Sequence, residues 1–214
     1  MGMSGKTACT CPYCGRTFEI EVWGSVNAET DPRERDRCVS GDLFRHSCPH
    51  CHAEFILQND LVYLDPRFRF VIWLSDKDPQ EQLIRFARPL VRKGWKMRRC
   101  ETIAEMVEKI QVFEDGMDDV AVELAKYDSF IEFLDNKKGN AEDVTSVEYQ
   151  RADNGVMKIN IRMDDKGMAF LIPVTMIEEE VEEDPERYAV NDEEFPCVNA
   201  DWMISLFTES EGQA

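Results

Sequence analysis

Two pairs of cysteines with identical spacing are the residues of this chain most able to do chemistry. Cys11 and Cys14 flank a Pro-Tyr dipeptide, and Cys48 and Cys51 flank a Pro-His dipeptide. A pair spaced in this way can be a redox dithiol, in which a helix N-terminus lowers the pKa of one thiol. Two such pairs can instead supply four thiolates to one metal ion in a tetrahedral site. The two chemistries require different elements around the cysteines.

The segments that flank the first pair favour the metal site. A redox dithiol follows a strand and precedes a helix, but residues 1–10 are rich in Gly, Ser, Lys and Thr and are not expected to form a strand. Residues 17–23 alternate apolar and polar side chains, which predicts a strand after the pair. In a zinc ribbon each pair lies in a tight turn between two short strands, and Gly15 suits that turn. A short polar helix at 32–40 accounts for the long separation between the pairs.

We therefore predict one structural Zn²⁺ held by Cys11, Cys14, Cys48 and Cys51. A redox pair, an iron site and a cluster without metal are the alternatives. Four thiolates leave no open coordination position, so the ion could not activate water and its role would be to stabilise the fold.

Other cysteines and histidines lie near these pairs or elsewhere in the chain. His46, His50 and His52 surround the second pair, and Cys9 precedes the first. They could be additional or alternative ligands, but polar side chains are common on exposed turns, and we expect them to be spectators. The remaining cysteines have no paired spacing and are predicted to be buried apolar residues, namely Cys38, Cys100 and Cys197.

The rest of the chain predicts an α+β fold in three parts. Residues 8–75 are expected to form a zinc-ribbon-like β domain, and residues 78–135 a helical segment that begins with Pro79. Thr102 and Glu105 form a capping box inside that segment. Residues 141–214 are expected to form an acidic region with strands at 145–150, 156–162 and 168–174 and a last helix capped by Asn199. The second and third parts could pack as one body.

Charge is distributed unevenly along the 214 residues. The net charge is −18, yet residues 66–100 carry ten Lys and Arg against three Asp and Glu. Residues 85–99 are predicted to form a basic helical stretch that contains Trp95. This stretch could bind phosphates with Trp95 stacked on a base, or it could pair with the acidic part of the chain. We favour pairing, because a strongly acidic molecule repels nucleic acid at long range.

The cysteine pairs and the segments around them resemble the CpXC domain family of bacterial proteins. The resemblance rests on CPYC, on CPHC and on the segments between and after them, and it extends over about residues 9–130. It implies a zinc-ribbon-like metal site and no assigned biochemical activity. His52 stands where the first pair has Gly15, so the second turn is expected to be looser.

The sequence predicts a non-enzymatic, zinc-stabilised protein with a role in protein interaction or self-association. It carries no nucleophile elbow, phosphate-binding loop or zinc-protease motif. The alternatives are a nucleic-acid-associated zinc ribbon that uses residues 85–99, and a thiol redox protein. The chain shows no signal-peptide pattern and no apolar run of membrane-spanning length, so a cytoplasmic location and no membrane partner are expected.

Overall fold

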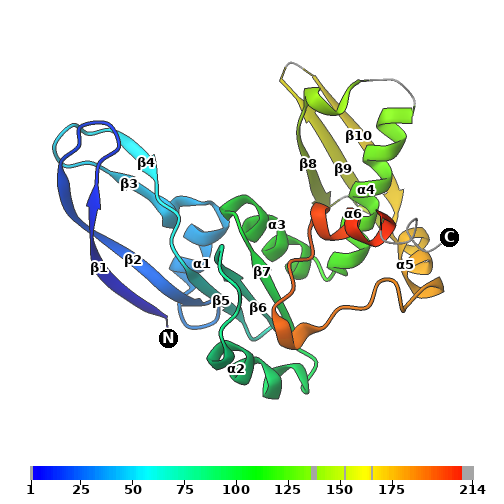
Figure 1. Cartoon of the computed structure of the whole chain (residues 1–214), viewed down its shortest axis with the longest axis horizontal. Helices are drawn as coiled ribbons and strands as arrows, with labels where there is room; N and C mark the ends of the chain where they lie inside the picture. The colour runs from blue at the N-terminus through cyan, green and yellow to red at the C-terminus, as the bar shows by residue number, and fades with distance from the viewer. Residues whose placement is uncertain (1, 136–138, 152, 165, 209–214) are drawn as a thin grey trace. The chain divides into compact units, whose positions relative to one another are not determined.

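The computed structural model describes residues 2–135, 139–151, 153–164 and 166–208. The chain divides into two compact units. Unit 1 comprises Met1–Gln111 and Asn191–Cys197, and unit 2 comprises Val112–Val190 and Val198–Ala214. The predicted three-part division stays a prediction, because compactness alone does not show which parts fold independently. The α+β class is confirmed, with strands and the cysteines first, helices next, and then a meander and a last helix (Figure 1).

Unit 1 is built on a five-stranded sheet with the order β1-β2-β5-β6-β7. β1 (Met3–Thr10) pairs antiparallel with β2 (Thr17–Asn27), and β5 (Leu61–Asp65) pairs antiparallel with β6 (Phe70–Leu74). β2 and β5 are parallel, as are β6 and β7 (Lys96–Cys100). The helix α1 (Pro32–Val39) and a short 3-10 turn, η1 (Asp42–Phe44), follow β2.

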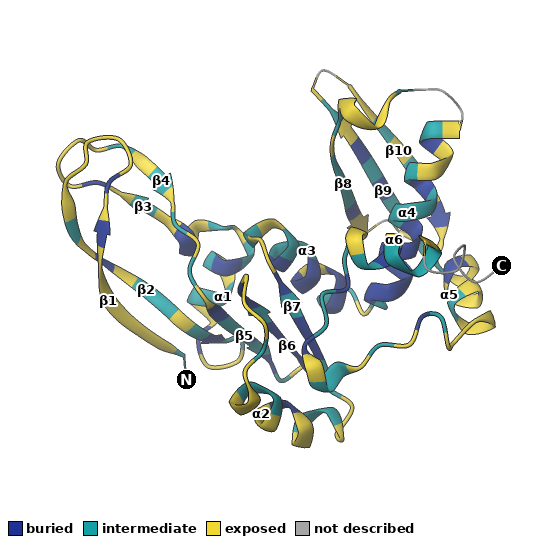
Figure 2. Cartoon of the chain, viewed as in Figure 1, coloured by how far each residue is buried: buried dark blue, intermediate teal, exposed yellow. Residues whose placement is uncertain are grey.

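One part of unit 1, which we call the cysteine arm, consists of β1, β2 and the hairpin of β3 (Arg45–Ser47) and β4 (Glu54–Ile56). The arm has little apolar core (Figure 2). Along β1 and β2 only Cys9, Ile20 and Val26 are buried. The expectation that no strand precedes the first cysteine pair is wrong, because β1 ends at Thr10. The strand forms although its residues are polar, since β2 pairs with it along its whole length.

The centre of the sheet is packed in the usual way. Every residue of β6 except Trp73 is buried, and the exposure of β5 alternates along the strand. The helix α2 (Glu81–Val91) places Ala87 against Val71 and Met97. α2 begins at Glu81 rather than at Pro79, and no side chain caps it. The basic stretch is not helical throughout, because its last residues form β7.

The segment 191–197, which we call the strap, returns to unit 1 and follows the outer edge of β7. The backbone N–H of Arg99 donates to the carbonyl of Pro196 (3.1 Å). Phe195 is 1% exposed, joins the core beside α2, and meets Trp73 edge-on. The strap therefore supplies apolar surface as well as carboxylates, including those of the 3-10 turn η3 (Asp192–Glu194).

The helix α3 (Ile103–Glu114) begins with the predicted capping box. The Thr102 hydroxyl accepts from the Glu105 N–H, and the Glu105 carboxylate accepts from the Thr102 N–H, each at 3.2 Å. These two bonds satisfy backbone donors that the first helical turn leaves without partners.

Unit 2 contains the predicted meander in the order β10-β9-β8. Its strands are β8 (Val144–Arg151), β9 (Val156–Met163) and β10 (Gly167–Pro173), and a 3-10 turn, η2 (Ala141–Asp143), precedes them. Its helices are α4 (Asp119–Asp135), α5 (Val174–Glu183) and α6 (Ala200–Thr208). Asn199 caps α6 as predicted, accepting from the Trp202 N–H at 3.0 Å. The end of the predicted acidic region, 209–214, lies outside the described residues. Among the helices that the structure describes, none is both long and apolar enough to cross a bilayer.

Candidate metal centre

The two cysteine turns have the same backbone hydrogen bonds. In the first turn the Gly15 N–H donates to the Cys11 carbonyl (3.0 Å), and in the second the His52 N–H donates to the Cys48 carbonyl (2.9 Å). The first cysteine of each turn also donates its N–H to the carbonyl of the residue five positions later, at 3.0 Å in both cases. Both turns are therefore closed tightly enough to fix the directions of their cysteine side chains.

His52 occupies the position that Gly15 occupies in the first turn. The φ angles are 69° for Gly15 and 60° for His52, so both residues are in the left-handed region. A Cβ placed on Gly15 would meet no atom within 4 Å, which shows that this position has room for a side chain. The expectation of a looser second turn is wrong, because its hydrogen bonds are as short as those of the first. His52 nevertheless adopts a conformation that a residue with a Cβ disfavours.

The turns bring the four predicted cysteines together. The Sγ atoms of Cys11, Cys14, Cys48 and Cys51 all lie within 4.8 Å of one another. The short distances join different turns: Cys11 to Cys51 and Cys14 to Cys48 are both 3.7 Å. A disulfide requires about 2.05 Å between sulfurs. The edge of a tetrahedron with metal–sulfur bonds of about 2.3 Å is about 3.8 Å. The donor set and its spacing therefore suit a tetrahedral metal ion.

A comparison with family models agrees with this geometry. The model described as CpXC protein matches residues 9–126, which is more than half of the chain. The chain belongs to the CpXC family. No curated protein and no solved structure matches it. The family match and the cysteine cluster together indicate a metal-binding domain.

The thiols of this CpXC cluster differ in acidity. Burial acts to raise the pKa of Cys48, but the backbone N–H groups of Cys51 and His50 and the neighbouring thiols lower it to about 7. The backbone N–H of Ala53 acts to lower the pKa of Cys51, but desolvation and the neighbouring sulfurs raise it to about 12. Once one thiol has ionised, its neighbours therefore resist ionisation. A cation among the sulfurs would remove that resistance.

The first cysteine of each CpXC turn is buried, and the second is exposed. Aromatic side chains pack beside the second turn: the Phe18 ring meets the rings of His50 and Phe55 edge-on, with centroid distances of 6.4 and 6.3 Å. The sequence did not predict that Phe18 and Phe55 pack against each other beside the cysteine turns. The predicted strand at 17–23, which contains Phe18, was the available signal.

The other candidate ligands lie outside the cluster. Among the described residues, the group that could hold a metal contains four cysteines and neither Cys9 nor any histidine. His50 contributes its backbone N–H, 3.4 Å from the Cys48 sulfur, rather than a ring nitrogen. Cys38 and Cys100 are buried as predicted, and Cys197 is half-buried.

The strap takes up part of the basic stretch. Arg98 is 2% exposed and forms an ion pair with Asp192, and Arg88 donates to Glu193 at 3.2 Å. This confirms for these two arginines the expectation that the stretch pairs with the acidic part of the chain.

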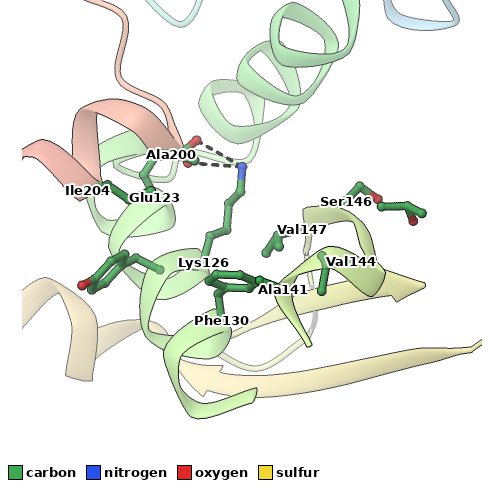
Figure 3. Close-up of a pocket in the computed structure, with 11 residues that line it drawn as sticks. Glu123, Lys126, Phe130, Ala141, Val144, Ser146, Val147, Ala200 and Ile204 are labelled. Atoms are coloured by element: carbon green, nitrogen blue, oxygen red, sulfur yellow. Dashed lines mark hydrogen bonds and ion pairs between the residues drawn. The ribbon is translucent and has the colours of Figure 1, made fainter. Parts of the chain in front are cut away.

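Unit 2 contains a separate cavity of about 300 Å³, which sequence reasoning missed (Figure 3). Its walls come from α4, α6 and the start of β8, and they are mainly apolar, with Phe130, Val147 and Ile204 among them. The Lys126 ammonium reaches the Glu123 carboxylate at 3.2 Å, and these side chains are 12% and 4% exposed. Because the two charges are paired with each other, the polar end of the cavity is electrically neutral.

Proposed function

We propose that the four cysteines bind one structural Zn²⁺ that holds the cysteine arm together. The observation that carries this proposal is the 3.7 Å spacing of sulfurs from different turns. Zinc is the ion most often bound by four thiolates in a tetrahedron, and thiolate ligands do not suit Mg²⁺ or Ca²⁺. Bound zinc would offset the repulsion among the thiolates and join the two hairpins.

The low burial of the arm supports a structural role. Beyond Cys9, Ile20 and Val26, the long hairpin has no buried side chain along its two strands. A two-stranded hairpin of this kind is marginally stable in water. The binding free energy of structural zinc is roughly 10–16 kcal/mol in small domains, which is large enough to offset that deficit.

A redox function is less compatible with the geometry. The strand before Cys11 would suit a redox dithiol, but the strand β2 follows Cys14 where a helix N-terminus is required. The shortest sulfur distances also join the two motifs, whereas a redox dithiol joins the cysteines of one motif.

With a closed ligand set and no catalytic motif, we propose a non-enzymatic role as a protein-interaction module in the cytoplasm. A reducing compartment fits a chain in which none of the eight cysteines forms a disulfide.

Hydrogen exchange before and after chelation tests the structural role. We expect removal of the metal to abolish protection in β1–β4 and to leave β9 of unit 2 protected. A Cys9→Ser variant is the matched control, since Cys9 lies two residues from Cys11 and outside the cluster. This variant should behave like the native chain. Unchanged protection in β1–β4 after confirmed metal loss would reject a structural role for the ion.

A further inference from the structure

A basic surface remains on unit 1 after the strap has paired with Arg88 and Arg98. We call it the basic patch, and it consists of Arg67, Phe68, Arg69, Arg92 and Lys93. All five residues are exposed. They come from two turns that lie more than twenty positions apart in the sequence. The basic stretch at 85–99 contains only Arg92 and Lys93 of the patch.

The register of the sheet places the two turns side by side. Arg67, Phe68 and Arg69 precede β6, whereas Arg92 and Lys93 precede β7. β6 and β7 are parallel, and they are joined at this end by a bond of 3.0 Å from the Lys96 N–H to the Arg69 carbonyl. The two turns therefore lie at the same end of the sheet.

Hydrogen bonds fix both turns. The buried carboxylate of Asp65 accepts from the N–H groups of Arg67 and Phe68 at 2.8 and 3.2 Å. Gly94, with φ 78°, lies in the turn that follows α2, and its N–H donates to the Val91 carbonyl at 2.8 Å. The patch is thus a preformed surface and not a flexible tail.

The charges of the patch are not neutralised within the described part of the chain. There, no carboxylate lies within ion-pair distance of Arg67, Arg69, Arg92 or Lys93. The Arg67 guanidinium instead lies 5.0 Å from the centre of the Phe68 ring, and Phe68 is 37% exposed. Four cations at one end of the sheet, one of them beside an exposed aromatic ring, are suited to an anionic partner that also offers an apolar side chain.

Unit 2 carries a surface of that description on α5. Met176 is 53% exposed, and Glu179 and Glu183 follow it at helical spacing, so the three side chains lie on one face. Ile177 is buried, which places this face away from the core. The last turn of α5 has no basic residue, although a helix C-terminus favours cations. A cationic partner would relieve this unfavourable electrostatic arrangement.

We propose that the basic patch of one copy of this chain binds the acidic face of α5 in a second copy. The two surfaces are complementary in charge, and each has an apolar residue, Phe68 or Met176, among its charges. Reciprocal contacts related by a two-fold axis would close a dimer. The proposal specifies the partner of the interaction role proposed above, and it does not depend on the metal.

Sedimentation velocity of the full chain at two salt concentrations tests the proposal. We expect a self-associated species at about 50 mM salt and a monomer at about 500 mM, because salt screens exposed charges. A chain that is monomeric at both concentrations would overturn the proposal. If that monomer binds a thymidine oligonucleotide through the basic patch, the patch is a nucleic-acid-binding surface instead.

Charge-reversal variants identify the surfaces. Arg92→Glu with Lys93→Glu should abolish association, as should Glu179→Lys with Glu183→Lys, and an equal mixture of the two variants should restore it. Arg85→Glu is the control, since Arg85 is an exposed residue of α2 that pairs with Glu81. Failure of the mixture to associate, or equal loss with Arg85→Glu, would contradict the assignment. Metal content is measured on the same samples. If a variant loses association but keeps its metal, the loss concerns the interface and not the zinc site.

Discussion

The long strands of the cysteine arm, β1 and β2, share one five-stranded sheet with the central strands of unit 1, but the two regions are stabilised differently. β6 buries four of its five residues, and one of them, Val71, packs with Ala87 of α2 and Phe195 of the strap. β1 buries only Cys9, and its end leads directly into the sulfur cluster. One end of the sheet is therefore held by apolar burial, whereas the other depends on four side chains that converge on one point. Hydrogen bonding between strands is common to both, so it does not explain the difference.

The largest effect that separates the two regions should come from Cys48→Ser. Cys48 is fully buried, and its loss removes one of the four thiolates. We expect most of the metal-binding free energy, roughly 10–16 kcal/mol in comparable sites, to be lost, and the arm to become disordered. The readouts are metal content and the NMR spectrum, in which the signals of β9 should stay unchanged. An arm that remains ordered without the metal would remove the distinction between the two regions.

Phe195→Ala should affect the centre of the sheet and not the arm. The side chain is 1% exposed and packs with Val71, Ala87 and Met97. Truncating a buried phenylalanine costs about 3–5 kcal/mol. Denaturant unfolding should show this loss while the metal content stays at the native value. Metal loss in the folded variant would mean that the two regions are not independent.

Changing the pH should act on unit 2 and on the arm in opposite directions. Burial, together with the nearby Glu180 carboxylate, raises the pKa of Asp128 from 3.8 to about 6. The folded state then binds this proton more tightly, so the stability that it contributes is present at low pH and is lost as the pH rises through about 6. The arm should lose metal as the pH falls, because thiolate ligands become protonated.

Asp128→Asn shows how much of the pH dependence of the stability of unit 2 comes from Asp128 and how much from the other acidic side chains. We expect the variant to raise the melting temperature of unit 2 at neutral pH and to give no gain near pH 4, where the native carboxyl is largely protonated. Burial and the Glu180 carboxylate raise the pKa of Tyr188, and Asp128 adds to this effect, so the substitution should lower the pKa of Tyr188. An equal gain at both pH values would show that the carboxyl does not titrate in this way.

The smallest effect should come from the two equivalent positions in the cysteine turns. His52→Gly relieves a left-handed conformation at φ 60°, and we expect tighter metal binding by less than about 1 kcal/mol. Gly15→Ala at φ 69° is the matched opposite change, and it should weaken binding by about 1 kcal/mol or more. Competition with a chelator of known affinity measures both. The same sign for both substitutions would contradict the equivalence of the turns.

The sequence predicted the four cysteines of the cluster, the meander of unit 2, and the caps at Thr102 and Asn199. These features depend on local spacing, which a sequence shows directly. β1 was missed because polar residues form a strand there only when β2 is beside them. β7 was missed because Arg98 and Arg99 are typical of an exposed helix, yet the buried Arg98 pairs with Asp192 from a distant segment.

The strap and the basic patch could not be predicted for a related reason. Phe195 follows three consecutive acidic residues, so its burial depends on contacts with residues more than a hundred positions earlier. The turns that carry Arg67 and Arg92 come to the same end of the sheet only through the parallel pairing of β6 and β7.

Measurement of metal content and free thiols on chain purified without added metal decides whether the four cysteines hold a structural zinc ion. We expect one zinc ion per chain, four thiols that do not react with a maleimide until a chelator is added, and no disulfide between motif cysteines. Stoichiometric iron, or a chain without metal whose motif cysteines form a reversible disulfide, would contradict it.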